Sequence, residues 1–537
     1  MILIAFLGLL YGAYSASRRP PPRVLTLHNG TSSFAPTTIL ISLDGFRADF
    51  LHRNITPSLN ALVQAGVSPQ YMLPSFPSVT FPNHFTLVTG LYPEAHGIVG
   101  NSFWDPNLLE EFTYTDPARS MQPKWWAGEP IWETAEEQGL RTAIHMWPGS
   151  EAHIGTIEPA YVDKYNGKEL LSNKVNRILD LLDLPGPEEP SANAITPRPQ
   201  LIAAYVPNVD ADGHLYGPNS TEVRKTIQSV DEMIGDLSRG LEARNLTNIV
   251  NVVVVSDHGM ATTSTSRLIQ LDDIIDMSLV EHTDGWPLYG LRPNLDTDID
   301  VLYGHLKAEA ETSGNFEVYL RDKDMPQRYH FSKNARIAPL WMIPKTGWAI
   351  VTRDVFDVEA GLKQGLEWHP KGLHGYDHEH PLMRAIFMAR GPAFPHAPGS
   401  EVEVFQNIEV YNIVCDSLGI TPKPNNGTLH LPLKTVGIHD AAPPVEVSED
   451  PPINDMLGFE AAPAKTEDTT LQTPQAAASV NEAVPTRPVV HDGEKAEDDN
   501  KDKNLWWEWV TGKIDGIKDW ATGLLDKVEN STKTQGS

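Results

Sequence analysis

Ile39-Leu40-Ile41-Ser42-Leu43-Asp44 is an apolar run that ends on a carboxylate. Residues 201–210, with His214 four positions later, and residues 249–258, which end in Ser-Asp-His, have the same form. Apolar runs without strict alternation are typical of parallel strands that are buried on both faces. Because the carboxyl ends of such strands meet in one crevice, we expect their polar side chains to converge there.

Two further segments add a hydroxyl and an imidazole to this set. Residues 76–84 read Phe-Pro-Ser-Val-Thr-Phe-Pro-Asn-His, and residues 373–377 read Leu-His-Gly-Tyr-Asp. Pro82 favours the first turn of a helix, which places Thr80 at or just before a helix N-terminus, where unpaired N–H groups favour a phosphate. A free threonine hydroxyl is too weakly acidic to attack, so Thr80 as a nucleophile needs a metal ion that deprotonates it. The alternative role of Thr80 is that of an N-cap, and the two roles are compatible.

The carboxylates and imidazoles of these segments suit zinc, which binds Asp oxygen and His nitrogen. Two zinc ions about 4 Å apart can hold the attacking and the leaving oxygen of a phosphoryl transfer. A single Asp–His pair is more often structural, whereas three strand-end aspartates with histidines nearby indicate a two-metal enzyme. The candidate ligands, enough for two sites of three residues each, are Asp44, Asp210, His214, Asp257, His258 and His374.

The composition limits the possible functions. The chain has 537 residues, and its formal net charge of −28 argues against binding a nucleic-acid duplex through a broad basic face. The single cysteine, Cys415, rules out an intrachain disulfide and a thiolate zinc cluster. Cys415 lies in a predicted helix, residues 409–418, and is interpreted as a buried structural thiol.

The N-terminus indicates export. Residues 2–14 are apolar but shorter than a membrane span, and we interpret residues 1–19 as a signal sequence or a truncated signal-anchor, with a buried core helix as the alternative. We therefore expect a protein of the secretory pathway, extracellular or lumenal, that is either released or anchored to a membrane at its N-terminus. Six N-x-S/T sequons predict a glycoprotein; their asparagines are Asn29, Asn54, Asn219, Asn245, Asn426 and Asn530.

Strand-like and helical patterns alternate from residue 37 to about residue 440, after a Pro- and Thr-rich linker over residues 20–36. This alternation predicts an α/β domain with a parallel sheet that helices cover on both faces. Apolar spacing predicts helices at residues 166–184 and 221–241. A long segment separates His258 from His374, and we expect it to form an inserted lobe, about residues 260–370, that caps the site. Its predicted strands are residues 315–321 and 347–352.

The C-terminal part differs in composition. Residues 440–503 hold 15 Asp and Glu against 5 Lys and Arg, and a disordered acidic tail is predicted for residues 441–503. Residues 504–530 regain amphipathic spacing and carry several tryptophans. A helix over residues 505–528 could lie at a membrane surface. Docking of that helix on the protein or on a partner is the alternative.

Four motifs resemble the nucleotide pyrophosphatase/phosphodiesterase (type I phosphodiesterase) family of the alkaline phosphatase superfamily. They are residues 41–47 (Ile-Ser-Leu-Asp-Gly-Phe-Arg), 80–84 (Thr-Phe-Pro-Asn-His), 89–99 (Thr-Gly-Leu-Tyr-Pro-Glu-Ala-His-Gly-Ile-Val) and 255–260 (Val-Ser-Asp-His-Gly-Met). The resemblance covers residues 37–440, about three-quarters of the chain. It implies an alkaline-phosphatase-like core, in which helices flank a mostly parallel sheet, and an inserted cap lobe.

The resemblance also implies a role for each candidate residue. Asp210, His214 and His374 would hold one Zn²⁺, and Asp44, Asp257, His258 and the Thr80 oxygen would hold the other. Asn101 matches an asparagine that donates to a phosphate oxygen, although it could be only a turn residue. Residues at two further positions sandwich the nucleobase in family members, and a strand-end packing role is the alternative for the second; they are Phe81 and Tyr205.

The implied reaction consists of two in-line displacements through a threonyl-nucleotide intermediate, and it would convert ATP to AMP and pyrophosphate. Two residues depart from the family pattern. Val79 stands where some animal members carry lysine, so the phosphate contacts there are expected to differ, and His378 stands where many members carry asparagine. No obligate protein partner is evident from the sequence.

Three alternatives remain open at this point. The same metals could serve a phosphodiesterase that acts on choline or lysophospholipid head groups. They could also serve a phosphomonoesterase. The third alternative is a non-catalytic adaptor that uses the acidic tail and the tryptophan-rich helix to bind a membrane or a partner.

Overall fold

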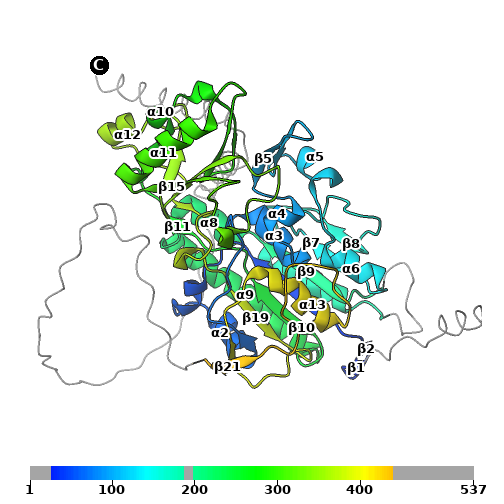
Figure 1. The fold of residues 1–537 in the computed structure, drawn as a ribbon. Helices are drawn as coiled ribbons and strands as arrows, with labels where there is room; N and C mark the ends of the chain where they lie inside the picture. The colour runs from blue at the N-terminus through cyan, green and yellow to red at the C-terminus, as the bar shows by residue number, and fades with distance from the viewer. Residues whose placement is uncertain (1–25, 187–196, 440–537) are drawn as a thin grey trace, which may run out of the picture. The chain divides into compact units, whose positions relative to one another are not determined.

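A nine-stranded sheet lies at the centre of the computed structural model, which describes residues 26–186 and 197–439 (Figure 1). Its strands are hydrogen-bonded in the order β21 (Thr435–Ile438), β20 (Ser400–Val402), β4 (Val67–Ser68), β19 (Phe387–Arg390), β10 (Asn251–Val255), β3 (Thr38–Leu43), β9 (Leu201–Val206), β7 (Thr142–His145) and β8 (Tyr161–Asp163).

The sheet is mostly parallel. β10, β3, β9, β7 and β8 pair in parallel, whereas β19 runs antiparallel to both of its neighbours. β3, β9 and β10 are buried at every position, which explains why their sequences are apolar without alternation. Ser42 of β3 pairs with Tyr205 of β9 and Val255 of β10, so these strands end at the same level. The predicted fold class is confirmed.

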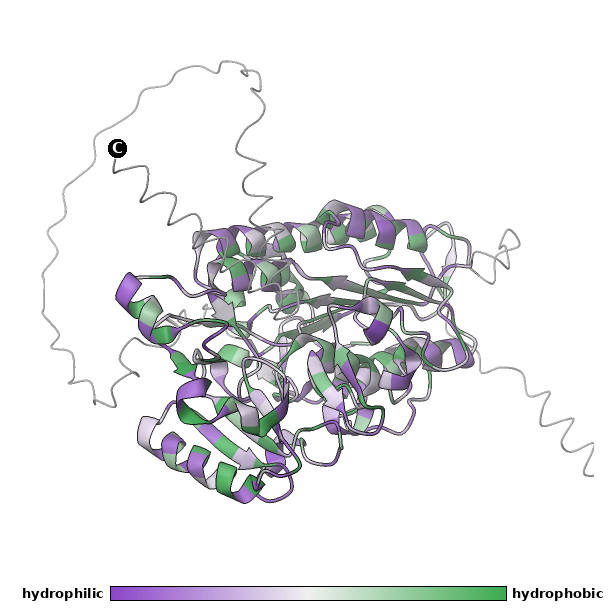
Figure 2. Ribbon diagram, turned by 90° about the horizontal axis from the view of Figure 1, so that it is seen from above, coloured by the Kyte–Doolittle hydropathy of each residue, from purple (hydrophilic) through white to green (hydrophobic). Residues whose placement is uncertain are grey.

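Helices cover both faces of this sheet. Ile39 and Ile41 of β3 contribute to one hydrophobic core, and Leu40 contributes to the other, because successive side chains of a strand point to opposite faces. In Figure 2 the strands of the sheet are coloured mainly as hydrophobic, and the helices carry hydrophilic residues. The first core contains side chains of α2 (Pro57–Ala65), α7 (Leu171–Leu182) and α9 (Thr221–Ala243), and the second those of α3 (Thr80–Thr89), α6 (Ile131–Glu137) and α13 (Val410–Leu418).

The two helices predicted from apolar spacing are present, but their boundaries differ from the prediction. α9 begins at Thr221 as predicted, because the Ser220 side chain accepts a hydrogen bond from the N–H of Val223 (3.2 Å) and caps the helix. α7 begins at Leu171 rather than at residue 166. Oδ1 of Asn166 accepts a hydrogen bond from the N–H of Lys168 (3.1 Å) and closes a turn. The helix therefore begins after this turn, at Leu171.

A small lobe forms between His258 and His374, where an insertion is predicted. It comprises an antiparallel sheet and α11 (Ile299–Ser313), whose apolar side chains share one core. The strand order of this sheet is β13 (Val280–Asp284), β14 (Tyr289–Pro293), β16 (Leu340–Pro344) and β15 (Phe316–Leu320).

Two pairs of short strands connect the small lobe to the main sheet region. β12 (Leu268–Gln270) pairs in parallel with β17 (Ala349–Val351). β11 (Ala261–Thr262) pairs antiparallel with β18 (Gly372–Leu373), so the chain leaves and returns at one place.

The predicted linker is partly structured. β1 (Leu27–His28) and β2 (Ser33–Phe34) form an antiparallel hairpin within residues 20–36. Oδ1 of Asn29 accepts hydrogen bonds from the N–H groups of Thr31 and Ser32 and closes the hairpin turn. Phe34 is buried, and the guanidinium carbon of Arg198 lies 3.9 Å from its ring centroid. The composition of the segment does not reveal these contacts.

Several predictions fall outside the described residues: the N-terminal segment 1–19, the tail 441–503, the helix 504–530 and the sequon at Asn530. Within residues 26–186 and 197–439, no helix is both long enough and apolar enough to span a bilayer. Cys415 lies in α13 and is free and fully buried, as predicted.

His96, the last residue of α4 (Pro93–His96), should make the stability of the fold depend on pH. Its Nδ1 accepts a hydrogen bond from the N–H of Ile98 (3.2 Å), so its Nε2–H donates to Oγ1 of Thr86 (3.0 Å). Burial lowers the pKa of His96 to about 3. The unfolded chain binds a proton near pH 6.5 that the folded protein does not bind, so His96 should lower the free energy of unfolding by about 2 kcal/mol between pH 6.5 and pH 5.

Urea unfolding of the wild type and of His96→Gln at these two pH values tests this expectation. The variant should be less stable at pH 6.5, but its free energy of unfolding should change less between the two pH values. The difference between the two proteins isolates the contribution of His96 from that of other titrating groups. An equal change in both proteins would contradict the prediction.

Candidate active site

The carboxyl ends of the central strands bring the predicted ligands together. Asp44 directly follows β3, and Asp257 lies two residues after the end of β10. Asp210 differs from the prediction, because β9 ends at Val206 and Asp210 lies in the first turn of α8 (Asn208–Tyr216). Pro207 follows β9 and lacks the N–H that a further ladder hydrogen bond requires.

Asp210, His214 and His374 form the first group of candidate ligands. The Nε2 atoms of His214 and His374 each lie 3.4 Å from a carboxylate oxygen of Asp210, and 3.1 Å from each other. His214 donates its Nδ1–H to the carbonyl of Gly372 (2.8 Å), and His374 donates to that of Ser78 (3.0 Å). Both Nε2 lone pairs therefore face the carboxylate, an arrangement that a bound cation would stabilise.

Asp44, Asp257 and His258 form the second group. Nε2 of His258 lies 2.9 Å from Oδ2 of Asp257 and 3.6 Å from Oδ1 of Asp44, while its Nδ1–H donates to the carbonyl of Gly259 (2.9 Å). Against the effect of burial, the charge of Asp257 raises the pKa of His258. A proton is thus favoured at the position where a cation would bind. The rings of His258 and His374 stack with centroids 3.6 Å apart, which places the two groups side by side.

The donor set fits metal ions. Oδ1 of Asp44 and Oδ1 of Asp210 are buried and accept no hydrogen bond among the described residues. Burial, followed by the charges of Asp257 and Asp210, raises the pKa of Asp44 well above its usual range. Buried carboxylates of this kind are unfavourable unless a cation neutralises them. Burial, together with the nearby His258, lowers the pKa of His374 to about 3, so that the ring is neutral and its lone pair is available.

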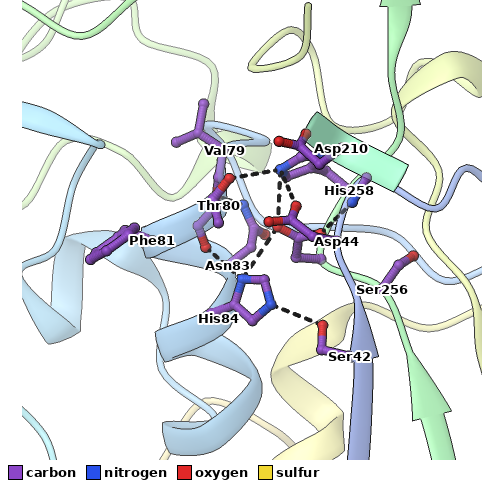
Figure 3. A network of polar contacts seen from close by, with 12 residues as sticks. Ser42, Asp44, Val79, Thr80, Phe81, Asn83, His84, Asp210, Ser256 and His258 are labelled. Carbon is purple, nitrogen blue, oxygen red and sulfur yellow. Dashed lines mark hydrogen bonds and ion pairs between the residues drawn. The ribbon is translucent and has the colours of Figure 1, made fainter. Parts of the chain in front are cut away.

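Thr80 points its hydroxyl at the second group. It is the first residue of α3, and its Oγ1 lies 3.3 Å from Nε2 of His258 (Figure 3). Val79 occupies the N-cap position, and no side chain caps the helix. The Thr80 hydroxyl therefore does not serve as a cap, and it lies beside a candidate metal site.

Asn101 uses one of the N–H groups at the start of α3. The N–H of Phe81 donates to Oδ1 of Asn101 (3.0 Å). Pro82 has no N–H, and the N–H of Asn83 donates to the carbonyl of Val79 (3.2 Å). In the described structure, Thr80 therefore holds the one remaining backbone donor among these first residues. Because Asn101 accepts through Oδ1, its amino group can donate to another acceptor, such as a substrate oxygen.

The two predicted nucleobase contacts differ in exposure. Phe81 is half-buried, and its ring centroid lies 5.4 Å from that of Tyr114. Tyr205 is 6% exposed, and its hydroxyl donates a hydrogen bond to Oδ2 of Asp44. Only Phe81 of this pair leaves a substantial part of its side chain open to solvent.

Tyr165 lies at the site and was not predicted. It follows β8 by two residues, is 41% exposed, and its ring centroid lies 6.3 Å from that of Tyr205. Burial, followed by the charges of Asp44 and Asp210, raises the pKa of Tyr165. An aromatic residue just after a strand that runs parallel to the central strands is the sequence signal that could have identified it.

His84 is a second residue that was not predicted. It is fully buried in α3, with Nε2 2.9 Å from Oγ of Ser42 and Nδ1 3.0 Å from the carbonyl oxygen of Thr80 (Figure 3). The same Nδ1 lies 3.3 Å from Oδ2 of Asp257. His84 thus connects the first turn of α3 to β3 and to the second ligand group.

A family model described as type I phosphodiesterase / nucleotide pyrophosphatase matches residues 38–377. The chain belongs to this family. As a type I phosphodiesterase / nucleotide pyrophosphatase it is a hydrolase of phosphodiester and phosphoric anhydride bonds. Enzymes of the family depend on metal ions, and the two groups of residues described above could hold them.

Relatives of the chain include fungal and animal members of the family. A pyrophosphatase/phosphodiesterase of Schizosaccharomyces pombe is 45% identical over 416 residues, which cover 76% of this chain and 82% of the relative. Human ectonucleotide pyrophosphatase/phosphodiesterase family member 1 is 37% identical over 404 residues, or 73% of this chain and 41% of that protein. The chain thus spans less than half of the length of this human relative.

Solved structures of the family share the fold. Murine ectonucleotide pyrophosphatase/phosphodiesterase 5 matches with a TM-score of 0.64 and 31% identity, over 73% of this chain and 97% of that chain. An inactive threonine-to-alanine variant of the murine protein has been solved in complex with AMP, and it matches with a TM-score of 0.64 and 30% identity over the same shares of both chains. The murine relative therefore binds a nucleotide.

Proposed function

We propose that the protein hydrolyses nucleotide phosphodiester and pyrophosphate bonds, with Thr80 as the nucleophile and two Zn²⁺ ions as cofactors. The position of Thr80 carries this proposal, because its hydroxyl lies 3.3 Å from Nε2 of His258 in one ligand group. His258 belongs to the second ligand group, and its ring stacks on that of His374 in the first group, so the two groups adjoin. A hydroxyl beside two cation sites is an arrangement that suits phosphoryl transfer through a covalent intermediate.

Zinc is the metal that the donor set fits best, since imidazole nitrogen and carboxylate oxygen are its usual ligands in sites without cysteine. When bound, the two ions would lower the pKa of the Thr80 hydroxyl and neutralise the charge that develops on the leaving oxygen. The first would be held by Asp210, His214 and His374, and the second by Asp44, Asp257, His258 and the Thr80 oxygen.

Each residue of the site has its own role in the proposed reaction. Thr80 forms an ester bond to the substrate phosphorus while the alcohol or phosphate leaves from the opposite side. Water displaces Thr80 in a second step and releases the nucleoside monophosphate, so that ATP yields AMP and pyrophosphate. The amino group of Asn101 donates to a non-bridging oxygen. The half-buried ring of Phe81 and the exposed ring of Tyr165 are the side chains proposed to stack on a nucleobase.

The residues at positions 79 and 378 favour diesters over monoesters. Val79 precedes the nucleophile and carries no charge. Burial lowers the pKa of His378 to about 4, so its ring is neutral at neutral pH. Neither residue supplies the positive charge that a fully ionised phosphate monoester would need, whereas a diester carries one negative charge fewer.

The test compares hydrolysis of p-nitrophenyl thymidine 5′-monophosphate with that of p-nitrophenyl phosphate, with and without a chelator and with zinc restored. The proposal predicts faster hydrolysis of the diester, loss of activity with the chelator and recovery with zinc. A folded, zinc-loaded protein without diesterase activity would refute the nucleotide assignment. Competition by choline phosphodiesters or lysophospholipids, but not by nucleotides, would favour the lipid alternative.

We also infer that the protein enters the secretory pathway and acts outside the cell or in a lumen. Relatives carry the prefix ecto in their names. Protein from its native source should gain electrophoretic mobility after N-glycosidase treatment, and the absence of a shift would argue against this inference. Among the described residues, the exposed sequon asparagines are Asn54, Asn219, Asn245 and Asn426.

A further inference from the structure

We propose that Tyr205 is a positioning residue for Asp44 and not a nucleobase contact. The inference rests on the proposed function in one respect, namely that Asp44 holds a metal ion. The hydroxyl of Tyr205 donates to Oδ2 of Asp44, while Oδ1 of the same carboxylate accepts no hydrogen bond in the described structure. The phenol thereby occupies one oxygen and leaves the other, 3.6 Å from Nε2 of His258, for a cation.

The backbone of Tyr205 is held in place from two sides. Tyr205 belongs to β9 and pairs with Ser42 of β3, two residues before Asp44. Its carbonyl oxygen accepts a hydrogen bond from Nζ of Lys174 (3.0 Å), and Lys174 is itself buried in α7. Strand pairing and this hydrogen bond fix the distance between the Tyr205 and Asp44 backbones.

The ring of Tyr205 is fixed as well. It meets the ring of His84 edge to face, with centroids 4.9 Å apart and an interplanar angle of 88°. His84 is fully buried and hydrogen-bonded to Ser42, so it cannot yield to the ring without breaking that contact. The phenol O–H therefore reaches Asp44 from a direction that packing determines, which is how outer residues orient the ligands of a metal.

A nucleobase contact requires an accessible ring face, and Tyr205 does not offer one. Tyr205 is 6% exposed, whereas Tyr165 beside it is 41% exposed. To expose its face, Tyr205 would have to withdraw its hydroxyl from a buried carboxylate and leave that oxygen without a partner.

Tyr205→Phe tests the proposal, because it removes one oxygen atom and keeps the ring. Tyr303→Phe is the matched control: Tyr303 in the small lobe also donates to a carboxylate, Oδ2 of Asp324 (2.6 Å). The metal-free proteins are titrated with zinc in competition with a chromophoric chelator, without substrate. Tyr205→Phe should weaken the affinity for one of the two zinc ions by about 10- to 100-fold. The control should bind both ions as the wild type does.

Kinetics provide the second measurement. For Tyr205→Phe, kcat should fall by a similar factor with KM unchanged, both for a nucleotide diester and for bis(p-nitrophenyl) phosphate, which has no nucleobase. Wild-type zinc affinity in Tyr205→Phe, with a folded protein confirmed by circular dichroism, would overturn the proposal. A rise in KM confined to the nucleotide would overturn it in favour of stacking. A wild type that binds two zinc ions but hydrolyses no nucleotide would instead refute the proposed function.

Discussion

Thr80→Ala should lower kcat for nucleotide diester hydrolysis by a factor on the order of 10⁴ or more. The substitution removes the atom that would form the bond to phosphorus, and the other hydroxyl described beside the second ligand group, that of Tyr205, donates to Oδ2 of Asp44. Binding of the product AMP should persist, because the proposed contacts of Phe81, Asn101 and Tyr165 remain.

Steady-state kinetics with p-nitrophenyl thymidine 5′-monophosphate and equilibrium dialysis with AMP measure the two quantities. Thr80→Ser keeps a hydroxyl and should retain part of the activity. Thr312→Ala is a matched control in α11, where the Thr312 hydroxyl donates to the carbonyl of Ala308 (2.9 Å) far from any proposed reacting atom. Retention of a tenth or more of wild-type kcat by Thr80→Ala would show that Thr80 is not the nucleophile.

Asp44→Asn should change stability in opposite directions in the presence and absence of metal. Burial and the charges of Asp257 and Asp210 raise the pKa of Asp44. A carboxyl group whose folded-state pKa lies above its unfolded value destabilises the fold once pH rises through the folded pKa. In metal-free protein at pH 8, the neutral asparagine should therefore raise the free energy of unfolding, by on the order of 1–2 kcal/mol.

With zinc present the order should reverse. The wild type gains stability from bound metal, whereas the variant has lost a charged ligand and gains less. Its kcat should also fall, by about 100-fold or more. Thermal unfolding of both proteins with chelator and with excess zinc provides the four values needed. A metal-free Asp44→Asn protein that is less stable than the metal-free wild type would contradict the electrostatic argument.

The sequence predicts the parts of this site that follow from strand geometry. Asp44 and Asp257 lie at the ends of apolar runs, and the ends of parallel strands coincide, so their proximity can be inferred without coordinates. The helix start at Thr80 is equally local, because Pro82 favours the first turn. The position of Asp210 is harder to predict from the sequence, because an apolar run does not show whether the polar residue after it ends the strand or begins the next helix.

Side-chain contacts between distant segments account for what the sequence does not predict. Tyr205 and Asp44 are 161 residues apart in the chain, and no periodic pattern in the sequence predicts the hydrogen bond between them. The backbone carbonyls that orient His214 and His374 belong to Gly372 and Ser78. Every residue has a backbone carbonyl, so the sequence does not show which carbonyls make these contacts. The role of each residue therefore depends on geometry that only the folded chain supplies.

The pairing of β11 with β18 also affects which parts of the chain can change during evolution without disturbing the site. Ala261 of β11 pairs with Leu373, which directly precedes His374, while His258 lies three residues before β11. Both ends of residues 263–371 are thus joined beside the candidate ligands, and changes in the length or sequence of this segment need not displace His258 or His374. The segment can be replaced or extended as a module, so the surroundings of the site can vary over evolutionary time while the metal-binding geometry stays the same.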